Sequence, residues 1–201
     1  MKKILVIIVL AVALIFGGRY FSSTYNDLAQ ANQVVELSYA QLQNVLARQA
    51  ELLPNMAAVA KSYATHEEKT FQEVAAARSG LTAVAQMKPS ELANNPDAQK
   101  QLIAAQTAVS NAMINMRQVT EAYPQLQAND NFKILMAELE GSINRVTVER
   151  KRNQEAVMVY NKKVVNFPTN LVAKVFSLGE KPFFKATAEQ QHAPDLNKVL
   201  N

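Results

Sequence analysis

Cysteine is absent from this chain, and glycine is scarce. Without cysteine there are no disulfides, no thiolate nucleophile and no zinc-finger pattern. Only five glycines occur in 201 residues, alongside abundant alanine, glutamine and leucine, which argues against a sheet protein with many tight turns. These absences favour a helical protein.

Sequence patterns of enzymatic sites are also absent. No glycine-rich phosphate loop occurs, and no serine follows a strand-turn-helix elbow. His66 precedes Glu67 but lacks the second histidine of a zinc-protease motif, and His192 lies in an expected tail. We therefore predict that the chain is not an enzyme and holds no metal or cofactor.

Positive charge is concentrated at the N-terminus. The formal net charge is +4, and Lys2, Lys3 and Arg19 supply three of these charges, so the remainder of the chain is close to neutral. A second basic run, from Arg145 to Arg152, lacks interleaved aromatic residues and is typical of a solvated helix face. We predict no nucleic-acid partner.

An unbroken apolar run extends from Ile4 to Phe16. As a helix it is about 20 Å long, short of the ~30 Å hydrocarbon thickness. Residues 17–21 lengthen it, and the flanking basic side chains can reach the headgroups. Residues 1–21 are therefore predicted to be a membrane anchor, in contact with lipid through residues 4–21.

The alternative for this segment is a cleaved signal with a periplasmic body. Cleavage needs small residues after the apolar core, but Ala11 and Ala13 fall inside it, and Phe16, Tyr20 and Phe21 are large. The basic residues favour a cytoplasmic N-terminus and an extracytoplasmic body, because two lysines precede the run and one arginine follows it. We expect a single-pass protein of the bacterial inner membrane.

The clearest helical pattern lies between Leu102 and Leu126. Asn95 suits an N-cap, Pro96 suits the first helical position, and Asp97 complements the helix dipole. Apolar residues then recur in two heptad rows, Leu102, Val109, Met116, Tyr123 and Ala105, Ala112, Val119, Leu126. This seam of alternating large and small residues predicts close helix packing.

Weaker apolar stripes in residues 25–53, 55–86 and 130–166 predict three further helices. We predict an all-α protein whose residues 22–166 form an up-and-down four-helix bundle, with a reversal at Pro54. Alternatively, Pro54 kinks one long helix that extends to Gln86. Residues 167–184 are expected to pack on the bundle as a short amphipathic helix and an extended segment, and residues 185–201 to be a disordered polar tail.

Several short motifs occur in a specific order and spacing: Tyr25-Asn26, Leu53-Pro54-Asn55, Tyr63-Ala64-Thr65-His66-Glu67, Ala77-Arg78, Glu121-Ala122-Tyr123-Pro124, Asn131-Phe132, Tyr160-Asn161 and Phe167-Pro168. From Phe21 to Phe184 the chain thereby resembles the LemA family of bacterial membrane proteins. The resemblance implies one transmembrane helix, a helical bundle and no established enzymatic activity. The chain departs from the family at Ile143, at Asn153-Gln154 and at Phe183-Phe184-Lys185. Family members usually carry an acidic residue, a Tyr-Asn pair and a Tyr-Phe-Glu ending at these three places.

Glu67 is predicted to lie beside an apolar seam, where an ionised carboxylate needs a partner. Arg150 holds a similar position in the last long helix, seven residues from both Ile143 and Val157. We expect Glu67 and Arg150 to share an interior polar layer. Tyr63 is expected to line the same layer, and Arg78 with Glu155 to form a second pair.

Two functions are consistent with the sequence. One is a membrane-anchored, non-enzymatic adaptor of the cell envelope, whose partner the resemblance suggests to be an envelope protein. The other is a sensor that binds a ligand between its helices near Tyr63, Glu67 and Arg150. A cavity lined by those three residues would favour the sensor, and a filled core with an exposed apolar patch would favour the adaptor.

Overall fold

The computed structural model describes residues 2–184, apart from the side chains of Leu5 and Val6, and contains no strand in this range. The all-α prediction is therefore confirmed. The expected polar tail, residues 185–201, lies outside the described residues. Within residues 2–184 seven helices follow one another: α1 (Lys2–Lys61), α2 (Glu68–Ala85), α3 (Pro89–Asn94), α4 (Pro96–Ala122), α5 (Pro124–Ala128), α6 (Asp130–Val165) and α7 (Thr169–Val175).

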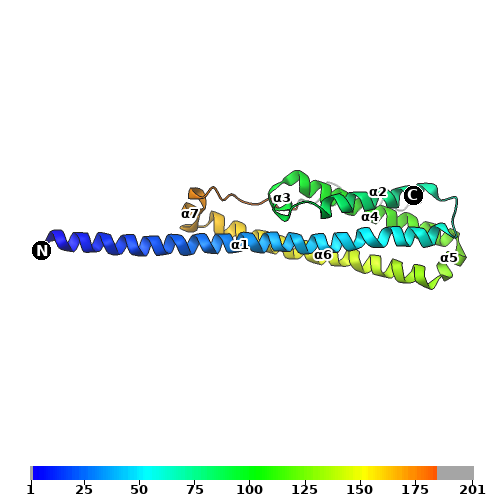
Figure 1. Ribbon diagram of the computed structural model, residues 1–201, viewed down its shortest axis with the longest axis horizontal. Coiled ribbons are helices and arrows are strands. Elements are labelled where there is room, and N and C mark those ends of the chain that lie inside the picture. The colour runs from blue at the N-terminus through cyan, green and yellow to red at the C-terminus, as the bar shows by residue number, and fades with distance from the viewer. Residues whose placement is uncertain (1, 185–201) are drawn as a thin grey trace, which may run out of the picture.

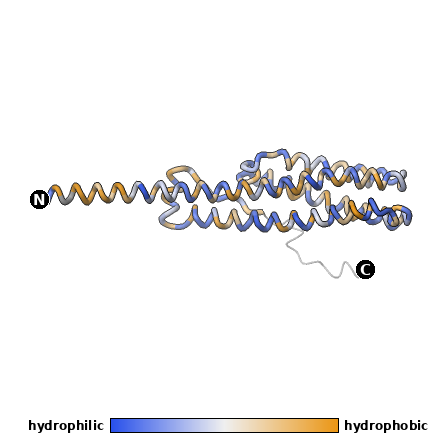
Figure 2. Tube along the Cα trace, turned by 60° about the horizontal axis from the view of Figure 1, so that its bottom comes forward, coloured by the Kyte–Doolittle hydropathy of each residue, from blue (hydrophilic) through white to orange (hydrophobic). Residues whose placement is uncertain are grey.

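The longest element, α1, has 60 residues and begins outside the bundle. Its N-terminal stretch projects beyond all other helices (Figure 1) and is strongly apolar (Figure 2). The side chains described there, from Lys2 to Ser23, are exposed. In length and composition this stretch is a candidate membrane span. The division into an anchor of residues 1–21 and a bundle stays a prediction, because α1 continues through residue 21 without a break.

Neither arrangement predicted for Pro54 is correct. Pro54 lies inside α1, and the chain reverses between Lys61 and Glu68. A proline within a helix costs about 3 kcal/mol. Leu53 and Met56, on either side of it, are both fully buried. Their burial offsets the cost, since burying one large apolar side chain is worth about 1.5–3 kcal/mol.

The four longest helices alternate in direction (Figure 1). Helix α1 leads away from the candidate membrane span, α2 returns, α4 leads away again and α6 returns the whole length of the bundle. Helix α1 packs against both α2 and α6, and α2 packs against α4. Because α6 has 36 residues and α2 only 18, the C-terminal part of α6 extends beside α1 past the end of α2, toward the candidate span.

The heptad seam predicted between Leu102 and Leu126 runs along α4 into α5 and is part of the hydrophobic core. Its members are buried except Tyr123, which is half-buried at the end of the helix. The predicted start of α4 is also confirmed, with the Asn95 side chain accepting a hydrogen bond from the Asp97 N–H. Small residues bring α2 and α4 close together, because a Cβ added to Gly80 would lie 3.4 Å from the Cβ of Ala105.

After α6 the chain forms α7 beside α1 and then runs along the bundle to α3 (Figure 1). The Phe176 ring packs against Phe21 and Tyr25 of α1, with ring centroids 5.7 and 4.3 Å apart. We call residues 178–184 the strap. It has no regular secondary structure, yet Lys181 and Phe184 in it are buried.

Candidate functional site

The structure does not bring Glu67 and Arg150 together. Glu67 lies in the reversal before α2, at the far end of the bundle, where its Oε1 is 3.4 Å from the donating hydroxyl of Tyr123. Arg150 lies midway along α6. The prediction assumed that the second helix ran through residue 67, and the later start of α2 shifts Glu67 to the bundle end.

The other predicted site residues are also separated. Tyr63 is exposed near the same bundle end, where its hydroxyl accepts a hydrogen bond from the Asn129 side chain at 2.9 Å. Arg78 lines a groove between α1 and α2, whereas Glu155 lines another between α1 and α6. The expected Arg78–Glu155 pair is therefore not formed.

A different polar layer lies inside the bundle, near the middle of α1. The Gln99 side chain in α4 donates hydrogen bonds to the Tyr39 hydroxyl at 2.8 Å and to the main-chain oxygens of Leu92 and Pro182 at 3.1 and 3.2 Å. In the same region the Asn153 amide donates to the Ser38 hydroxyl at 2.8 Å. Burial raises the pKa of Tyr39, whose side chain is fully enclosed, so the phenol stays neutral. This layer links α1, α4, α6 and the strap.

Lys181 holds the strap in place. Its Nζ donates to the Asn94 side chain at 2.8 Å and lies 5.1 Å from the centroid of the Tyr160 ring. Its main-chain N–H and carbonyl both pair with the side-chain amide of Asn161. Burial lowers the pKa of Lys181, and the negative charge of Glu36 opposes this shift.

Arg150 contacts the strap through an aromatic ring. Its guanidinium carbon lies 5.1 Å from the centroid of the Phe184 ring, which in turn packs on Tyr39 at 5.8 Å. Burial lowers the pKa of Arg150. Arg150 is half-buried, and the partner of its guanidinium is an aromatic ring and not the predicted carboxylate of Glu67.

Sequence reasoning missed most of this layer, although α6 carries a signal for it. Asn153 lies seven residues after Val146 and seven before Tyr160, so it is an amide in an otherwise apolar heptad row. Such a residue needs a polar partner inside the bundle. No comparable signal marks Lys181, because the strap has no periodicity.

The chemistry of the layer is structural. Its groups are amides, hydroxyls and two cations, and their contacts are with one another or with main-chain and aromatic groups. Among residues 2–184, no three histidine or acidic side chains lie close enough to hold a metal ion. Nothing in the layer pairs a nucleophile with a base.

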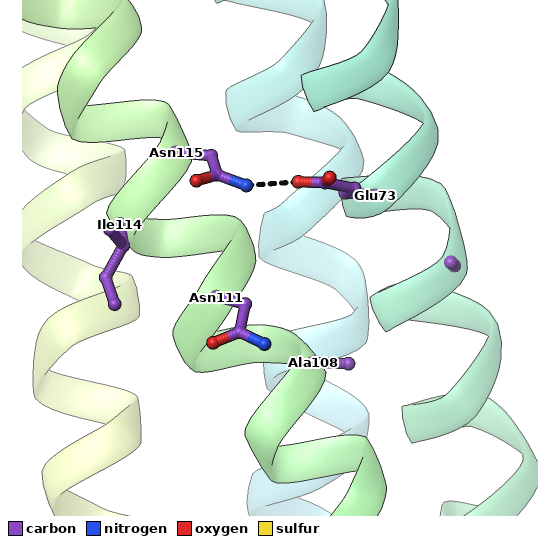
Figure 3. A pocket seen from close by; sticks show the side chains of 6 residues that line it. Glu73, Ala108, Asn111, Ile114 and Asn115 are labelled. Carbon is purple, nitrogen blue, oxygen red and sulfur yellow. Dashed lines mark hydrogen bonds between the residues drawn. The ribbon is translucent and has the colours of Figure 1, made fainter.

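Grooves between helices mark the outer surface. A groove of about 390 Å³ between α2 and α4 is crossed by a hydrogen bond from the Asn115 amide to the Glu73 carboxylate (Figure 3). A second groove, of about 380 Å³, lies between α1 and α6. We call it the α1–α6 groove, and its lining comprises Gln30, Ala31, Val34, Arg152, Glu155, Ala156, Val159 and Lys163.

Comparisons with known proteins give relatives over most of the chain. Magnetosome protein MamQ of Magnetospirillum gryphiswaldense is 23% identical over 171 residues, which are 82% of this chain and 63% of that protein. Two MamQ proteins of Paramagnetospirillum magneticum, MamQ 1 and MamQ 2, are each 27% identical over 86 residues, or 43% of this chain and 32% of theirs. This chain therefore spans less than two thirds of the length of these relatives.

The family comparison agrees with the motif resemblance. The model of the LemA family matches residues 38–197. Family membership accords with the candidate membrane span in α1, since the family is one of membrane proteins. The names of the relatives and of the family state no enzymatic activity. Because the family model matches well over half of its residues, this chain belongs to the LemA family.

Proposed function

We propose that this protein is a membrane-anchored, non-enzymatic adaptor of the bacterial cell envelope, which binds a protein partner in the α1–α6 groove. The observation that carries the proposal is the contrast between a filled interior and this open groove. The strap closes the interior polar layer with its own side chains, so the surface is where a partner is to be sought.

The walls of the α1–α6 groove are apolar. Val34 and Val159 face the groove from opposite helices, and each is 50% exposed. Leu37, one helical turn beyond Val34, is 58% exposed and extends the apolar stripe along α1. Two small residues, Ala31 and Ala156, also line the groove. A groove of this kind suits the apolar face of an amphipathic helix.

The rim of the groove carries both signs of charge. Arg152 and Lys163 are basic, and Glu155 between them is acidic. Arg152 also pairs with Glu149 at 2.7 Å, which holds its guanidinium near the groove. A mixed rim favours a partner helix with complementary charges in one register, and it disfavours nucleic acid or a uniformly acidic surface.

The anchor supplies the second half of the function. Restricting the chain to the bilayer raises its effective concentration toward other membrane proteins. We further propose that the membrane is the inner membrane, with the N-terminus cytoplasmic and the bundle outside. The word magnetosome in the names of the relatives describes those proteins and not this chain.

The sensor alternative has no support in the structure. It required a cavity lined by Tyr63, Glu67 and Arg150, but Arg150 lies far along α6 from the bundle end that holds the other two.

Crosslinking in living cells tests the adaptor. A photoreactive amino acid is placed at Val34 or at Val159, one on each wall of the groove, in the full-length chain. We expect both positions to capture one and the same envelope protein. Val159→Asp, with the photoreactive residue at position 34, should reduce the yield of that product at least several-fold.

Ile134 provides the matched control. It is an exposed aliphatic residue of α6, near the opposite end of the bundle from Val159. The same photoreactive residue at position 134 should not capture that protein. Recovery of only lipid and the chain itself from positions 34 and 159, or one identical product from all three positions, would overturn the proposal. Protease accessibility of the bundle in spheroplasts tests the orientation separately.

A further inference from the structure

We propose that α7 and the preceding Phe167 form a second membrane contact, with their apolar side chains inserted in the headgroup layer of the bilayer that α1 crosses. This contact rests on the anchor of the proposed function and needs no protein partner. It would fix the tilt of the bundle over the membrane.

Helix α7 is apolar on two sides. Val172 and Ala173 face the bundle and are only 2% and 1% exposed. Phe167, Leu171 and Val175 follow one another at intervals of four residues and are 79%, 54% and 66% exposed. Four-residue spacing within α7 places Leu171 and Val175 on one face. Contiguous exposed apolar groups of this kind mark an interaction surface.

The position of α7 along α1 identifies the occupant of this surface. A membrane span of about 20 residues counted from Ile4 ends near Ser23. Phe21 and Tyr25 lie on either side of that boundary, and Phe176 packs on both of them. Helix α7 therefore lies at the level where the hydrocarbon meets the headgroups, and aromatic side chains are favoured there.

The charges at this end of the molecule fit anionic lipid. Arg19 precedes Phe21 by two residues, Lys162 lies in the last turn of α6, and Lys174 lies in the last turn of α7. All three are exposed, as is Asp27 of α1, which carries the opposing charge. Exposed lysines beside an apolar helix face are typical of helices that lie in the plane of the interface.

Depth measurement by spin labels tests the contact directly. Because the chain has no cysteine, single cysteines can be introduced as labelling sites in the full-length protein. The labelled positions are Phe167→Cys, Leu171→Cys and Val175→Cys, with Val9→Cys in the anchor and Ile134→Cys as control. Each variant is reconstituted in vesicles of phosphatidylcholine with phosphatidylglycerol, and collisions with oxygen are compared with collisions with a water-soluble nickel complex.

Ile134 is a close match for Leu171, since it is 56% exposed in a helix at the far end of the bundle. We expect labels at 167, 171 and 175 to be accessible to oxygen, as in lipid, and the label at 134 to be accessible to the nickel complex, as in water. The label at position 9 reports the anchor separately. If it reports lipid while positions 167, 171 and 175 match position 134, the α7 contact is overturned and the anchor stands.

Two further outcomes bear on the occupant and on the charges. Labels shielded from both reagents would show that protein, such as a second copy of the chain, covers α7, and this would overturn the lipid assignment. In vesicles with phosphatidylglycerol, Lys174→Glu combined with Lys162→Glu should shift the label at 175 toward the aqueous value. Equal depth with and without these substitutions would overturn the electrostatic contribution.

Discussion

Asn161 and Lys181 exchange two hydrogen bonds through a side-chain amide and a main-chain peptide group. The Lys181 N–H donates to Asn161 Oδ1, and the Asn161 amide donates to the Lys181 carbonyl, each at 2.8 Å. Both groups are buried, so water cannot replace these partners. The strap, which has no regular secondary structure, is thereby hydrogen-bonded to α6 through both polar groups of the Lys181 main chain.

Asn161→Ala should detach the strap. The substitution leaves a buried N–H and a buried carbonyl unpaired, at about 1–3 kcal/mol each. We expect a loss of about 2–6 kcal/mol in the free energy of unfolding, measured by urea denaturation of the full chain in detergent. Limited proteolysis should then cleave within residues 178–184.

Asn144→Ala is the matched control for Asn161→Ala, because Asn144 is an exposed asparagine of the same helix. It should change the free energy of unfolding by less than about 0.5 kcal/mol. Equal effects of the two substitutions would show that the paired hydrogen bonds do not hold the strap.

Tyr39 should make the fold sensitive to alkaline pH. Its pKa is raised by burial, whereas the unfolded phenol titrates near its usual value of about 10. Below that pH both states keep the proton and the contribution to stability is complete. Above it the unfolded state releases the proton first, so stability falls as pH rises, by at most about 1.4 kcal/mol per pH unit for one group.

Comparison with Tyr39→Phe isolates this effect. The raised pKa of Tyr160 acts in the same direction, and the lowered pKa values of Lys181 and Arg150 act in the opposite one. These contributions are common to both proteins and cancel in the difference. The slope of unfolding free energy against pH above 10 should be shallower in Tyr39→Phe, whereas Tyr63→Phe, at an exposed position, serves as control. Identical slopes in Tyr39→Phe and the unsubstituted chain would refute the assignment.

Gly80 should accept alanine but not leucine. A Cβ at this position meets the Cβ of Ala105 at 3.4 Å, which is ordinary contact, so Gly80→Ala should gain up to about 1 kcal/mol from helix propensity. The larger Gly80→Leu must push α2 and α4 apart, at about 1–3 kcal/mol. Gly141 of α6 has open space around it, so Gly141→Leu should not destabilise. Thermal unfolding of the three variants and the unsubstituted chain would decide, and equal behaviour of the two leucine variants would contradict the close approach.

The sequence predicted the elements that depend on periodicity. The seam of α4 and the cap at Asn95 could be found because heptad spacing and capping chemistry are local properties. The reversal after Lys61 could not be found, because residues 62–67 contain neither glycine nor proline, while the proline at position 54 lies within a helix. In that case tertiary packing overrode local preference.

In the candidate site, too, local properties could be predicted and tertiary contacts could not. Arg150 and Asn153 could be placed toward the interior from helical spacing alone. Their contacts could not be predicted, because Phe184 and Ser38 are far away in the sequence and reach α6 only through the fold. A buried cation also suggested a carboxylate partner, whereas the strap supplies an aromatic ring. The error over Glu67 followed directly from the misplaced reversal.

A double-mutant cycle can measure the Arg150–Phe184 contact. Guanidinium and ring are 5.1 Å apart in a half-buried setting, so we expect a coupling free energy of about 1 kcal/mol between Arg150→Met and Phe184→Leu. Arg150→Met alone should lower the free energy of unfolding by less than this coupling free energy. The neutral methionine side chain does not pay the desolvation cost that lowers the Arg150 pKa.

Arg152→Met provides the control cycle with Phe184→Leu, since Arg152 is exposed and pairs with Glu149. Its coupling to Phe184 should be zero within about 0.3–0.5 kcal/mol, the usual limit of additivity for residues not in contact. A coupling for Arg150 no larger than that for Arg152 would mean that Phe184 holds the strap through its packing on Tyr39 alone. In that event Tyr39→Leu and Phe184→Leu, and not the arginine variants, should show the non-additive loss of stability, because these two rings pack on each other with centroids 5.8 Å apart.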